Sequence, residues 1–290
     1  MVEKKQIRTK DDQLISITCY QPDKPNGRNV IIGPAAQLTQ DQYLSFSLYL
    51  QKAGFTVITF DYRGMGDSAP NALKGYIAGL QQWASQDADA VIRYAKNTFP
   101  RNELIYVGHG IGGELIGLAP ASQYINRLVL VSSSLSCGRW WPLHGRLKFK
   151  LMKPIASVAN FVFGYFPGKK LGLKGNLPKG VVNEWTSWCK NPNGLFDLFP
   201  QNNYRKLQVP LLAISFANEW LTPEKGVKEL LTYFSGSTVT WHHVHPAQLG
   251  LKERSYCFFE PVLKNTLWTT VMEWLDREVR VGRLKMKNEE

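Results

Sequence analysis

The sequence predicts an α/β fold: a mostly parallel, twisted sheet covered by helices on both faces, with a helical cap insertion. Short apolar runs typical of buried strands alternate with segments of helical spacing, which is the pattern of parallel sheets. The motif GHGIGG at residues 108–113 follows one of these runs. From residue 138 to about residue 204 the alternation stops, and the segment is rich in Trp, Phe, Pro, Gly and Lys.

Turn residues and periodicity divide the chain before this motif. Asp11 and Asp12 form the polar turn of a predicted hairpin. Gly54 follows a run of helical spacing, at the position where helices commonly end on a left-handed residue. The elements predicted here are a hairpin over 6–20, strands over 28–32 and 55–60, a helix over 43–52, a tight loop over 61–68 and a helix over about 76–98.

The same pattern resumes after the motif and defines the domains. The elements predicted there are a short helix ending at Ala119, strands over 127–132, 209–216 and 238–244, a helix over 223–234 and a closing helix that includes Trp274. A chain of 290 residues with 44% hydrophobic content can form one large core with a sizeable insertion. We therefore expect a core of residues 1–137 and 205–290 and a cap insertion of residues 138–204.

The motif at residues 108–113 has the form of a nucleophile elbow, the sharp turn between a buried strand and a helix. Residues 103–107 are strand-like, and residues 114–118 are compatible with a helix. The pattern G-x-S-x-G requires a serine at its centre, where Gly110 stands. Covalent acyl transfer needs an activated oxygen or sulfur at this point, so the sequence predicts the turn without its nucleophile.

The chain is strongly basic, with a formal net charge of +12. Residues 138–190 contain ten lysines and arginines but only one acid, Glu184. Such charge favours association with nucleic acid, a membrane surface or an acidic ligand. No nucleic-acid-binding motif or stacking platform accompanies it, so we do not expect a nucleic-acid partner.

The termini and cysteines bear on location. Residues 1–5 lack the apolar core of a signal peptide, and no run of about 18 apolar residues suggests a membrane span. The four cysteines are scattered without metal-ligand spacing, which favours free thiols in a reducing compartment. We expect a cytoplasmic protein without a cofactor.

Several stretches carry a resemblance that runs nearly end to end. They are DYRGMGDS at 61–68, the elbow, WP at 141–142, FGYFPG at 163–168, EWTSWC at 184–189, SF at 215–216 and FF at 258–259. Together they resemble the α/β-hydrolase fold and, more narrowly, a family of predicted, largely uncharacterised bacterial α/β-hydrolases. That family usually reads GHSxGG at the elbow, SFSDD before a helix with a proline, and GHxGFF near the C-terminus.

The resemblance implies a degenerate catalytic triad. Residue by residue, the serine falls on Gly110 and the histidine on Ser255. The first acid becomes Asn218, with Glu219 beside it. Because nucleophile, base and acid depend on one another, ordinary esterase or lipase activity is not expected.

The resemblance also implies that parts of the site survive. The backbone N–H groups of Ile111 and of about Ala35 would form the oxyanion hole, and a helix N-terminus at Gly112 would add partial positive charge. The candidate ligand-binding residues are Ala35, Ala36, Gly110, Ile111, Trp141, Trp220 and Ser255.

Three side chains near the expected site are candidates for other chemistry. Glu219 could act as a general acid or base if burial beside Trp220 raises its pKa. His109 adjoins the elbow, where either packing or acid–base chemistry is open to it. Cys137 and a run of serines at 132–136 follow a strand's carboxyl end, but Cys137 has no visible base.

Three histidines fall in or just after one predicted strand. Alternation is expected to place His243 and His245 on opposite faces, and no Cys or carboxylate cluster accompanies them or His242. The sequence therefore predicts no metal site.

The cap residues and the altered triad leave two hypotheses for function. Aromatic residues interleaved with lysines allow a packed cap with a solvated basic face, a lid over an apolar ligand, or an element that lies on a membrane surface. The first hypothesis is a pseudo-hydrolase that binds a hydrophobic or acyl small molecule in the former active site. The alternative is a repurposed, non-hydrolytic cyclase, lyase or isomerase that uses the oxyanion hole and a lidded apolar pocket.

Overall fold

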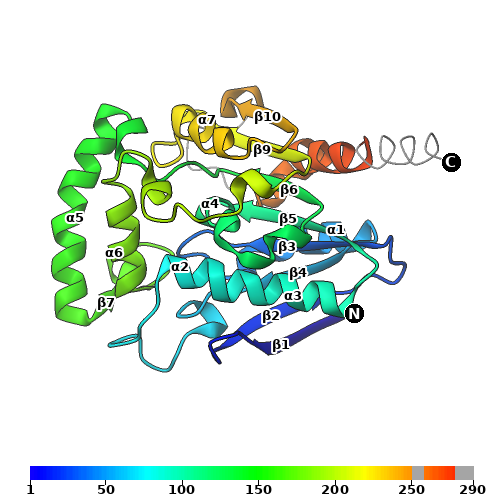
Figure 1. Ribbon diagram of the computed structural model, residues 1–290, viewed down its shortest axis with the longest axis horizontal. Coiled ribbons are helices and arrows are strands. Elements are labelled where there is room, and N and C mark those ends of the chain that lie inside the picture. Colours follow the sequence, from blue (N-terminus) through cyan, green and yellow to red (C-terminus); the bar gives the residue numbers. More distant parts are fainter. Residues whose placement is uncertain (250–257, 278–290) are drawn as a thin grey trace.

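The computed structural model describes residues 1–249 and 258–277 and places a twisted sheet between two layers of helices (Figure 1). Within these residues the sheet has eight strands in the order β1-β2-β4-β3-β5-β6-β9-β10. The β1–β2 and β2–β4 pairs are antiparallel, and all the other pairs of this sheet are parallel. The strands are β1 (Val2–Arg8), β2 (Leu14–Tyr20), β3 (Arg28–Gly33), β4 (Thr56–Phe60), β5 (Glu103–His109), β6 (Arg127–Val131), β9 (Leu211–Phe216) and β10 (Val239–Val244).

The carboxyl ends of the inner strands meet at one edge of the sheet. Gly33 of β3 pairs with Gly108 of β5, and His109 pairs with Val131 of β6. Val131 pairs in turn with Ile214 of β9. The loops that follow these four strands therefore lie at the same edge, where ligands bind in sheets of this kind.

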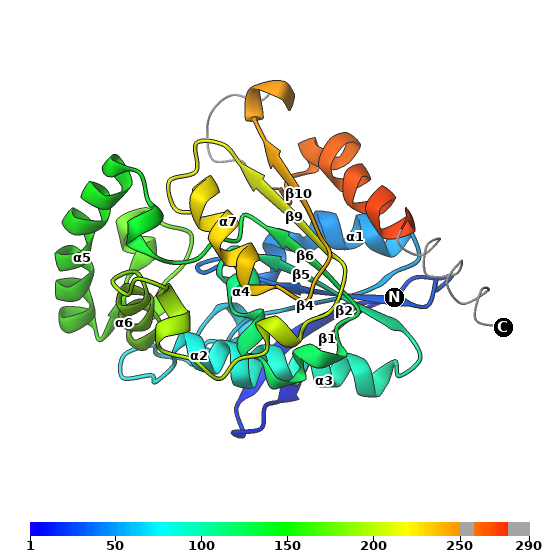
Figure 2. The same cartoon turned by 45° about the horizontal axis from the view of Figure 1, so that its top comes forward.

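Helices cover both faces of the sheet (Figure 2). One face carries α1 (Leu44–Lys52) and a C-terminal helix that begins with the π-helical turn Lys264–Trp268 and continues over 269–277. The other face carries α2 (Leu80–Gln82), α3 (Asp89–Thr98), α4 (Ile111–Glu114) and α7 (Glu224–Tyr233). Because both faces are covered, β4 and β6 are buried at every residue, which explains their continuous apolar sequences.

The helix predicted over 76–98 is shorter and less regular than expected. Gly79 has an extended backbone with φ −135° and ψ 169°, and its N–H donates to Oε1 of Gln82 at 3.0 Å. The helix therefore begins at Leu80. A π-helical turn, Trp83–Ala88, joins α2 to α3 and places Trp83 in the core.

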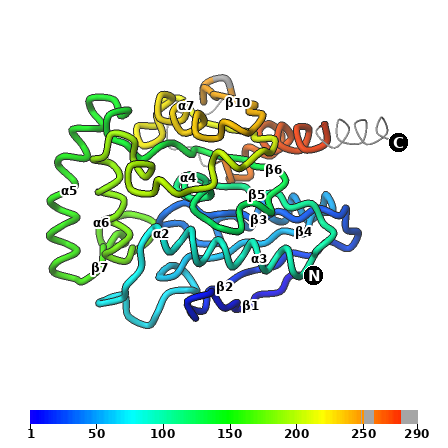
Figure 3. The backbone as a smooth tube through the Cα atoms, viewed as in Figure 1, coloured from blue at the N-terminus to red at the C-terminus, as the bar shows by residue number. Residues whose placement is uncertain are grey.

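Residues 138–204 contain two long helices and a small two-stranded sheet. They are α5 (Leu143–Phe163), β7 (Tyr165–Phe166), β8 (Leu177–Pro178) and α6 (Lys179–Trp188). The helix α5 is the outermost, and α6 lies between α5 and the rest of the molecule (Figure 3). In the described part of the chain, no helix is long and apolar enough to cross a membrane.

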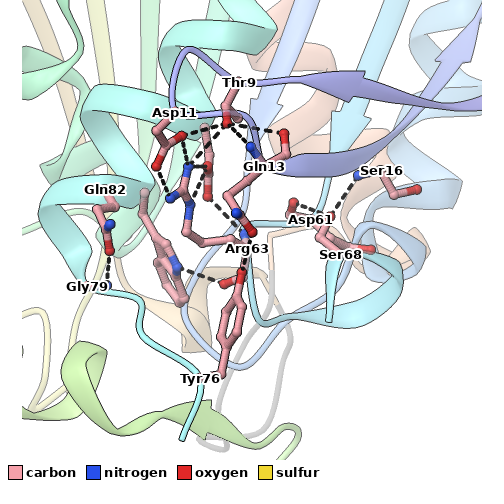
Figure 4. A network of polar contacts seen from close by, with 12 residues as sticks. Thr9, Asp11, Gln13, Ser16, Asp61, Arg63, Ser68, Tyr76, Gly79 and Gln82 are labelled. Atoms are coloured by element: carbon pink, nitrogen blue, oxygen red, sulfur yellow. Dashed lines mark hydrogen bonds and ion pairs between the residues drawn. The ribbon is translucent and has the colours of Figure 1, made fainter. Parts of the chain in front are cut away.

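Arg63 ties the loop after β4 to the first hairpin and to the α2–α3 region (Figure 4). Its Nε donates to Oδ1 of Asp87 at 2.8 Å, and its Nη2 donates to Oδ1 of Asp11 at 2.8 Å. Hydrogen bonds from the guanidinium lower the pKa of Asp11 to about 2. Burial raises the pKa of Asp87 to about 6, although the same guanidinium opposes this shift. The network therefore holds the loop that follows β4 against the first hairpin and the α2–α3 region.

Candidate functional site

The turn predicted between β5 and α4 is present, with Gly110 at its tip. Gly110 has φ 54° and ψ −120°, a conformation that favours glycine. Its N–H donates to the carbonyl oxygen of Val131 at 2.9 Å, and its carbonyl accepts the N–H of Glu114 at 3.1 Å. The chain therefore passes from a buried strand into a short helix in one sharp turn at the carboxyl edge of the sheet.

The glycines around Gly110 are required by close packing. A Cβ on Gly108 would lie 2.3 Å from Cα of Gly113, and a Cβ on Gly112 would lie 2.4 Å from the carbonyl oxygen of Gly33. Gly110 differs, because a Cβ there would be 3.4 Å from Cβ of Ala35 and would meet only ordinary contacts. Space for a side chain exists at the tip of the elbow, and none is present.

The Tyr43 hydroxyl accepts a hydrogen bond from one of the backbone N–H groups expected to form the oxyanion hole. The N–H of Ala35 donates to the Tyr43 hydroxyl oxygen at 2.9 Å. The same hydroxyl lies 3.0 Å from Nδ1 of His109, to which it can donate its proton. The backbone donor predicted at Ala35 is therefore engaged within the protein. Ile111, the other predicted donor, is partly buried at the start of α4.

His109 is held in an aromatic environment beside the elbow. Its ring lies 5.0 Å from the ring of Phe259 and makes an edge contact with Tyr43 at 5.9 Å. Desolvation lowers its pKa to about 4, so the imidazole is neutral at physiological pH. A neutral ring hydrogen-bonded to Tyr43 serves packing and hydrogen bonding.

The loop after β9 carries the two positions expected for the acid. Asn218 is exposed and has φ 68°. Glu219 is partly buried, and its carboxylate accepts a hydrogen bond from the Thr222 hydroxyl and interacts with Ser132. Burial raises the pKa of Glu219 despite these hydrogen bonds. Ser132 follows β6, and its carbonyl oxygen would lie 3.8 Å from a Cβ on Gly110, so Glu219 lies near the elbow.

The five histidines of the chain all fall within the described residues. Apart from His109, His144 lies exposed on α5, and the other three belong to β10 or follow it directly. The strand β10 is at the edge of the sheet, separated from β5 by β6 and β9. Three strand spacings make about 14 Å, so these histidines are remote from Gly110.

The prediction that His243 and His245 lie on opposite faces is wrong, because residues two apart on a strand share a face. Their rings are 5.6 Å apart. Nδ1 of His243 lies 2.8 Å from the Ser215 hydroxyl, and burial lowers the pKa of His243. Among residues 1–249 and 258–277 there is no group of three or more His, Cys, Asp or Glu side chains that could hold a metal.

Sequence reasoning missed Glu114, which is 1% exposed on the elbow helix. The backbone N–H of Ser136 donates to its Oε1, and the Ser136 hydroxyl donates to its Oε2, both at 2.6 Å. Burial raises the pKa of Glu114 to about 8, so the carboxyl is largely protonated at neutral pH. Nε1 of Trp185 donates to the Ser136 hydroxyl at 3.2 Å, which links α4 to α6. The sequence signal that could have identified Glu114 is its position directly after two glycines in an otherwise apolar run.

Two other nucleophile-type side chains near this edge, Cys137 and Ser133, are engaged in hydrogen bonds of the fold. The Cys137 thiol donates to the carbonyl oxygens of Asn191 and Pro192 at 3.1 and 3.2 Å, and burial raises its pKa. The Ser133 hydroxyl donates to the carbonyl of Gly108 at 3.3 Å. A thiol with a raised pKa is a poor nucleophile.

The predicted ligand-binding residues divide into two groups. Ala35 and Gly110 face each other at the elbow, whereas Trp141 and Trp220 pack together with ring centroids 5.7 Å apart. Nε1 of Trp141 is buried and has no hydrogen-bond acceptor among the described residues. Ser255 lies outside the residues that the structure describes.

A hollow of about 700 Å³ opens beside Trp141. Aromatic, aliphatic and cationic side chains line it, and no acid does. The predicted ligand-binding residues other than Trp141 do not line it. It is lined by Gly138, Trp141, Arg146, Phe149, Lys150, Lys153, Pro154, Ser157, Val158 and Lys190.

Comparisons with known proteins support the fold. Residues 30–173 match the model of a family described as serine aminopeptidase, S33. No curated protein matches the chain.

Three solved structures are similar over nearly their full lengths. A soluble variant of monoglyceride lipase from Saccharomyces cerevisiae has a TM-score of 0.66 and 14% identity, covering 96% of this chain and 95% of that one. A thermostable carboxyl esterase from Bacillus coagulans has a TM-score of 0.64 and 13% identity, covering 95% and 98%. DcsB in complex with a substrate analogue has a TM-score of 0.62 and 16% identity, covering 97% and 99%. The mostly parallel sheet, the elbow between β5 and α4 and these likenesses together show that the chain has the α/β-hydrolase fold.

Proposed function

We propose that the protein is a pseudo-hydrolase, which binds a hydrophobic or acyl small molecule in the former active site and does not hydrolyse it. The observation that carries this proposal is the elbow itself. Gly110 keeps the backbone turn and the space for a nucleophile but has no side chain, and His109 is neutral and engaged by Tyr43. A covalent acyl intermediate requires a nucleophile and a base in contact, and the described residues offer no such pair at the tip of the elbow.

An aromatic cluster, linked to the elbow helix α4 through Trp185, Ser136 and Glu114, supports an apolar ligand. Trp141, Phe149, Trp185 and Trp220 form a cluster with ring centroids 5.1–5.9 Å apart. The buried N–H of Trp141 has no acceptor among the described residues, and an unpaired buried donor is costly. A carbonyl or carboxylate oxygen on the ligand would satisfy it, which favours an acyl compound over a plain hydrocarbon.

Native mass spectrometry of the purified protein, with extraction of bound lipids and metabolites, tests this proposal. We expect an acyl compound to accompany the wild-type protein and to be lost from the Gly110→Trp variant. Gly110→Ala is the matched control, because it imposes the same backbone strain without filling the site. Trp141→Phe keeps an aromatic side chain and removes the N–H donor, so it should weaken retention of the compound. Retention by Gly110→Trp equal to that of Gly110→Ala would count against a ligand at the elbow.

A repurposed, non-hydrolytic enzyme is the second candidate, and Glu219 is the observation that favours it. Its raised pKa and its position beside Ser132, near the elbow, suit a general acid or base in a cyclase, lyase or isomerase reaction. Glu219→Gln discriminates the two functions once a ligand is known. If the protein only binds the ligand, the wild type and Glu219→Gln should both retain it unchanged. If the protein is an enzyme, the wild type should convert the ligand and Glu219→Gln should not.

We place this function in the cytoplasm. Cys19, Cys137 and Cys189 are buried free thiols, which suits a reducing compartment. Fractionation of cells that express the protein at its natural level tests the location, with recovery in an extracytoplasmic fraction as the contrary result.

A further inference from the structure

The outer surface of α5 carries an apolar stripe that no described part of the chain covers. The stripe consists of Leu143, Leu147, Leu151, Ile155, Val158 and Val162, spaced three or four residues apart and therefore on one side of the helix. Each of these side chains is between 57% and 84% exposed. Contiguous apolar surface of this kind marks an interaction site more often than chance exposure.

The position of α5 leaves this stripe accessible. In Figures 1 and 2 the helix is the outermost element at one end of the molecule, and only its inner side faces α6. The inner side packs through Phe149, which contacts Trp141 and Trp185. The stripe and the packed side of α5 are therefore separate, and binding at the stripe requires no unfolding.

Positive charge flanks the stripe on both sides. Helix α5 contains Arg146, Lys148, Lys150 and Lys153 and no acidic residue. At 100° per residue, Lys148 lies on one flank of the stripe and Lys150 on the other. An apolar face bordered by lysines is the pattern of a helix that lies in the surface of an anionic membrane.

The hollow beside α5 strengthens the case for anionic headgroups. Lys150, Lys153 and Lys190 line it, with no acid to balance them. The neighbouring ammonium group of Lys190 lowers the pKa of Lys153, so the two cations repel each other. A phosphate group between the two ammonium groups would relieve this repulsion. A zwitterionic or neutral surface would relieve it less.

We propose that α5 docks on an anionic phospholipid membrane, with the apolar stripe inserted among the acyl chains and the flanking cations at the headgroups. This interaction is separate from the proposed ligand site at the elbow, because it uses the outer face of α5. It also gives a role to the excess of positive charge in residues 138–190, which the ligand site does not require.

Vesicle flotation of the full chain tests the proposal. The probes are vesicles of equimolar phosphatidylglycerol and phosphatidylcholine, and vesicles of phosphatidylcholine alone. We expect flotation with the anionic vesicles, little with the neutral ones, and weakening when salt is raised from about 0.05 M to about 0.5 M. Failure to float with anionic vesicles at low salt overturns the proposal.

Two sets of variants separate this docking from general attraction by a basic protein. The triple variant Leu147→Ser/Leu151→Ser/Ile155→Ser should abolish flotation, whereas Leu14→Ser/Val239→Ser/Val262→Ser, at exposed apolar positions outside 138–204, should not. Lys148→Gln/Lys150→Gln/Lys153→Gln should weaken binding by about 100-fold, at about fivefold per cation. Lys10→Gln/Lys24→Gln/Lys52→Gln has the same charge change elsewhere and should have little effect.

Two further measurements complete the test. Circular dichroism melting of each variant shows that the fold is kept, which is expected because every substituted apolar side chain is exposed. Size-exclusion chromatography with light scattering, without vesicles, tests whether a second copy covers the stripe. If a triple variant on α5 and its matched control elsewhere in the chain lose flotation equally, the proposal is overturned. The proposal is also overturned if the wild-type protein is a dimer and only the apolar triple variant on α5 disrupts it, because a second copy would then cover the stripe.

Discussion

Gly110 and Ala35 face each other across the elbow, and a Cβ built on Gly110 would lie 3.4 Å from Cβ of Ala35. That distance is an ordinary van der Waals contact. Packing therefore does not require glycine at the tip of the elbow, in contrast to Gly108 and Gly112, where a Cβ would meet backbone atoms at 2.3 and 2.4 Å. For a Cβ at this position, the local cost is therefore the positive φ of Gly110.

Gly110→Ser should fold and remain without esterase activity. The strained backbone should cost about 1–3 kcal/mol of the free energy of unfolding, measured by urea titration. Turnover of short acyl esters should stay at background, because the neutral His109 is hydrogen-bonded to Tyr43 and the other histidines are remote. Rapid hydrolysis by this variant would show that a base reaches residue 110.

Tyr43→Phe should destabilise the protein through two lost partners. The hydroxyl accepts the N–H of Ala35 and lies in hydrogen-bonding distance of His109, and both would be left without it. We expect a loss of about 1–3 kcal/mol in thermal or urea unfolding. Tyr49→Phe, on the same face, is the matched control, because the structure gives the Tyr49 hydroxyl no hydrogen bond within the described chain. Similar losses in the two variants would contradict the bridging role.

Glu114→Gln should change how stability depends on pH. The pKa of Glu114 rises from about 4.5 to about 8 on folding, so its stabilising effect is fully present below pH 4.5 and is lost as pH rises towards 8. Relative to wild type, the variant should gain about 1.4 kcal/mol per pH unit across this window. Urea unfolding at several pH values measures the slope. Glu273→Gln, at a 59% exposed side chain, should follow the wild type. If the free energy of unfolding of Glu114→Gln depended on pH in the same way as that of the wild type, Glu114 would be ionised in the folded protein.

Arg63→Gln should be strongly destabilising, since it leaves the fully buried Asp87 without its cation. Breaking a buried pair by removing one partner costs about 3–5 kcal/mol. Arg93→Gln removes a pair with Asp89 in which the arginine is 47% exposed, and should cost no more than about 1 kcal/mol. Urea unfolding of the two variants measures this difference. Equal small losses would mean that the Arg63 network contributes little to the free energy of unfolding.

The sequence was sufficient for the sheet and the elbow, because both depend on local rules. Continuous apolar runs predicted the buried strands, and the spacing of Gly108, Gly110 and Gly112 predicted the turn. Asp11 and Asp12 correctly predicted the first hairpin turn, where Asp12 has φ 68°. These features need only neighbours in the chain.

The rest of the site depends on contacts between distant segments. Nothing local to Ala35 indicates that the Tyr43 hydroxyl occupies its N–H, and burial alone sets the raised pKa of Glu114. The start of the helix at Leu80 depends on the extended backbone of Gly79, which helical periodicity does not detect. The exposed stripe on α5 has the same apolar spacing as a buried face, so only the structure distinguishes the two.

Reaction of the wild-type protein with a serine-directed phosphonate probe, together with turnover of short acyl esters, tests the central claim most directly. A catalytic hydrolase from the same fold serves as the positive control. We expect no labelling by mass spectrometry and no ester turnover above background, because the elbow presents Gly110. Stoichiometric labelling or sustained ester turnover would contradict the account and place a working nucleophile elsewhere in the chain.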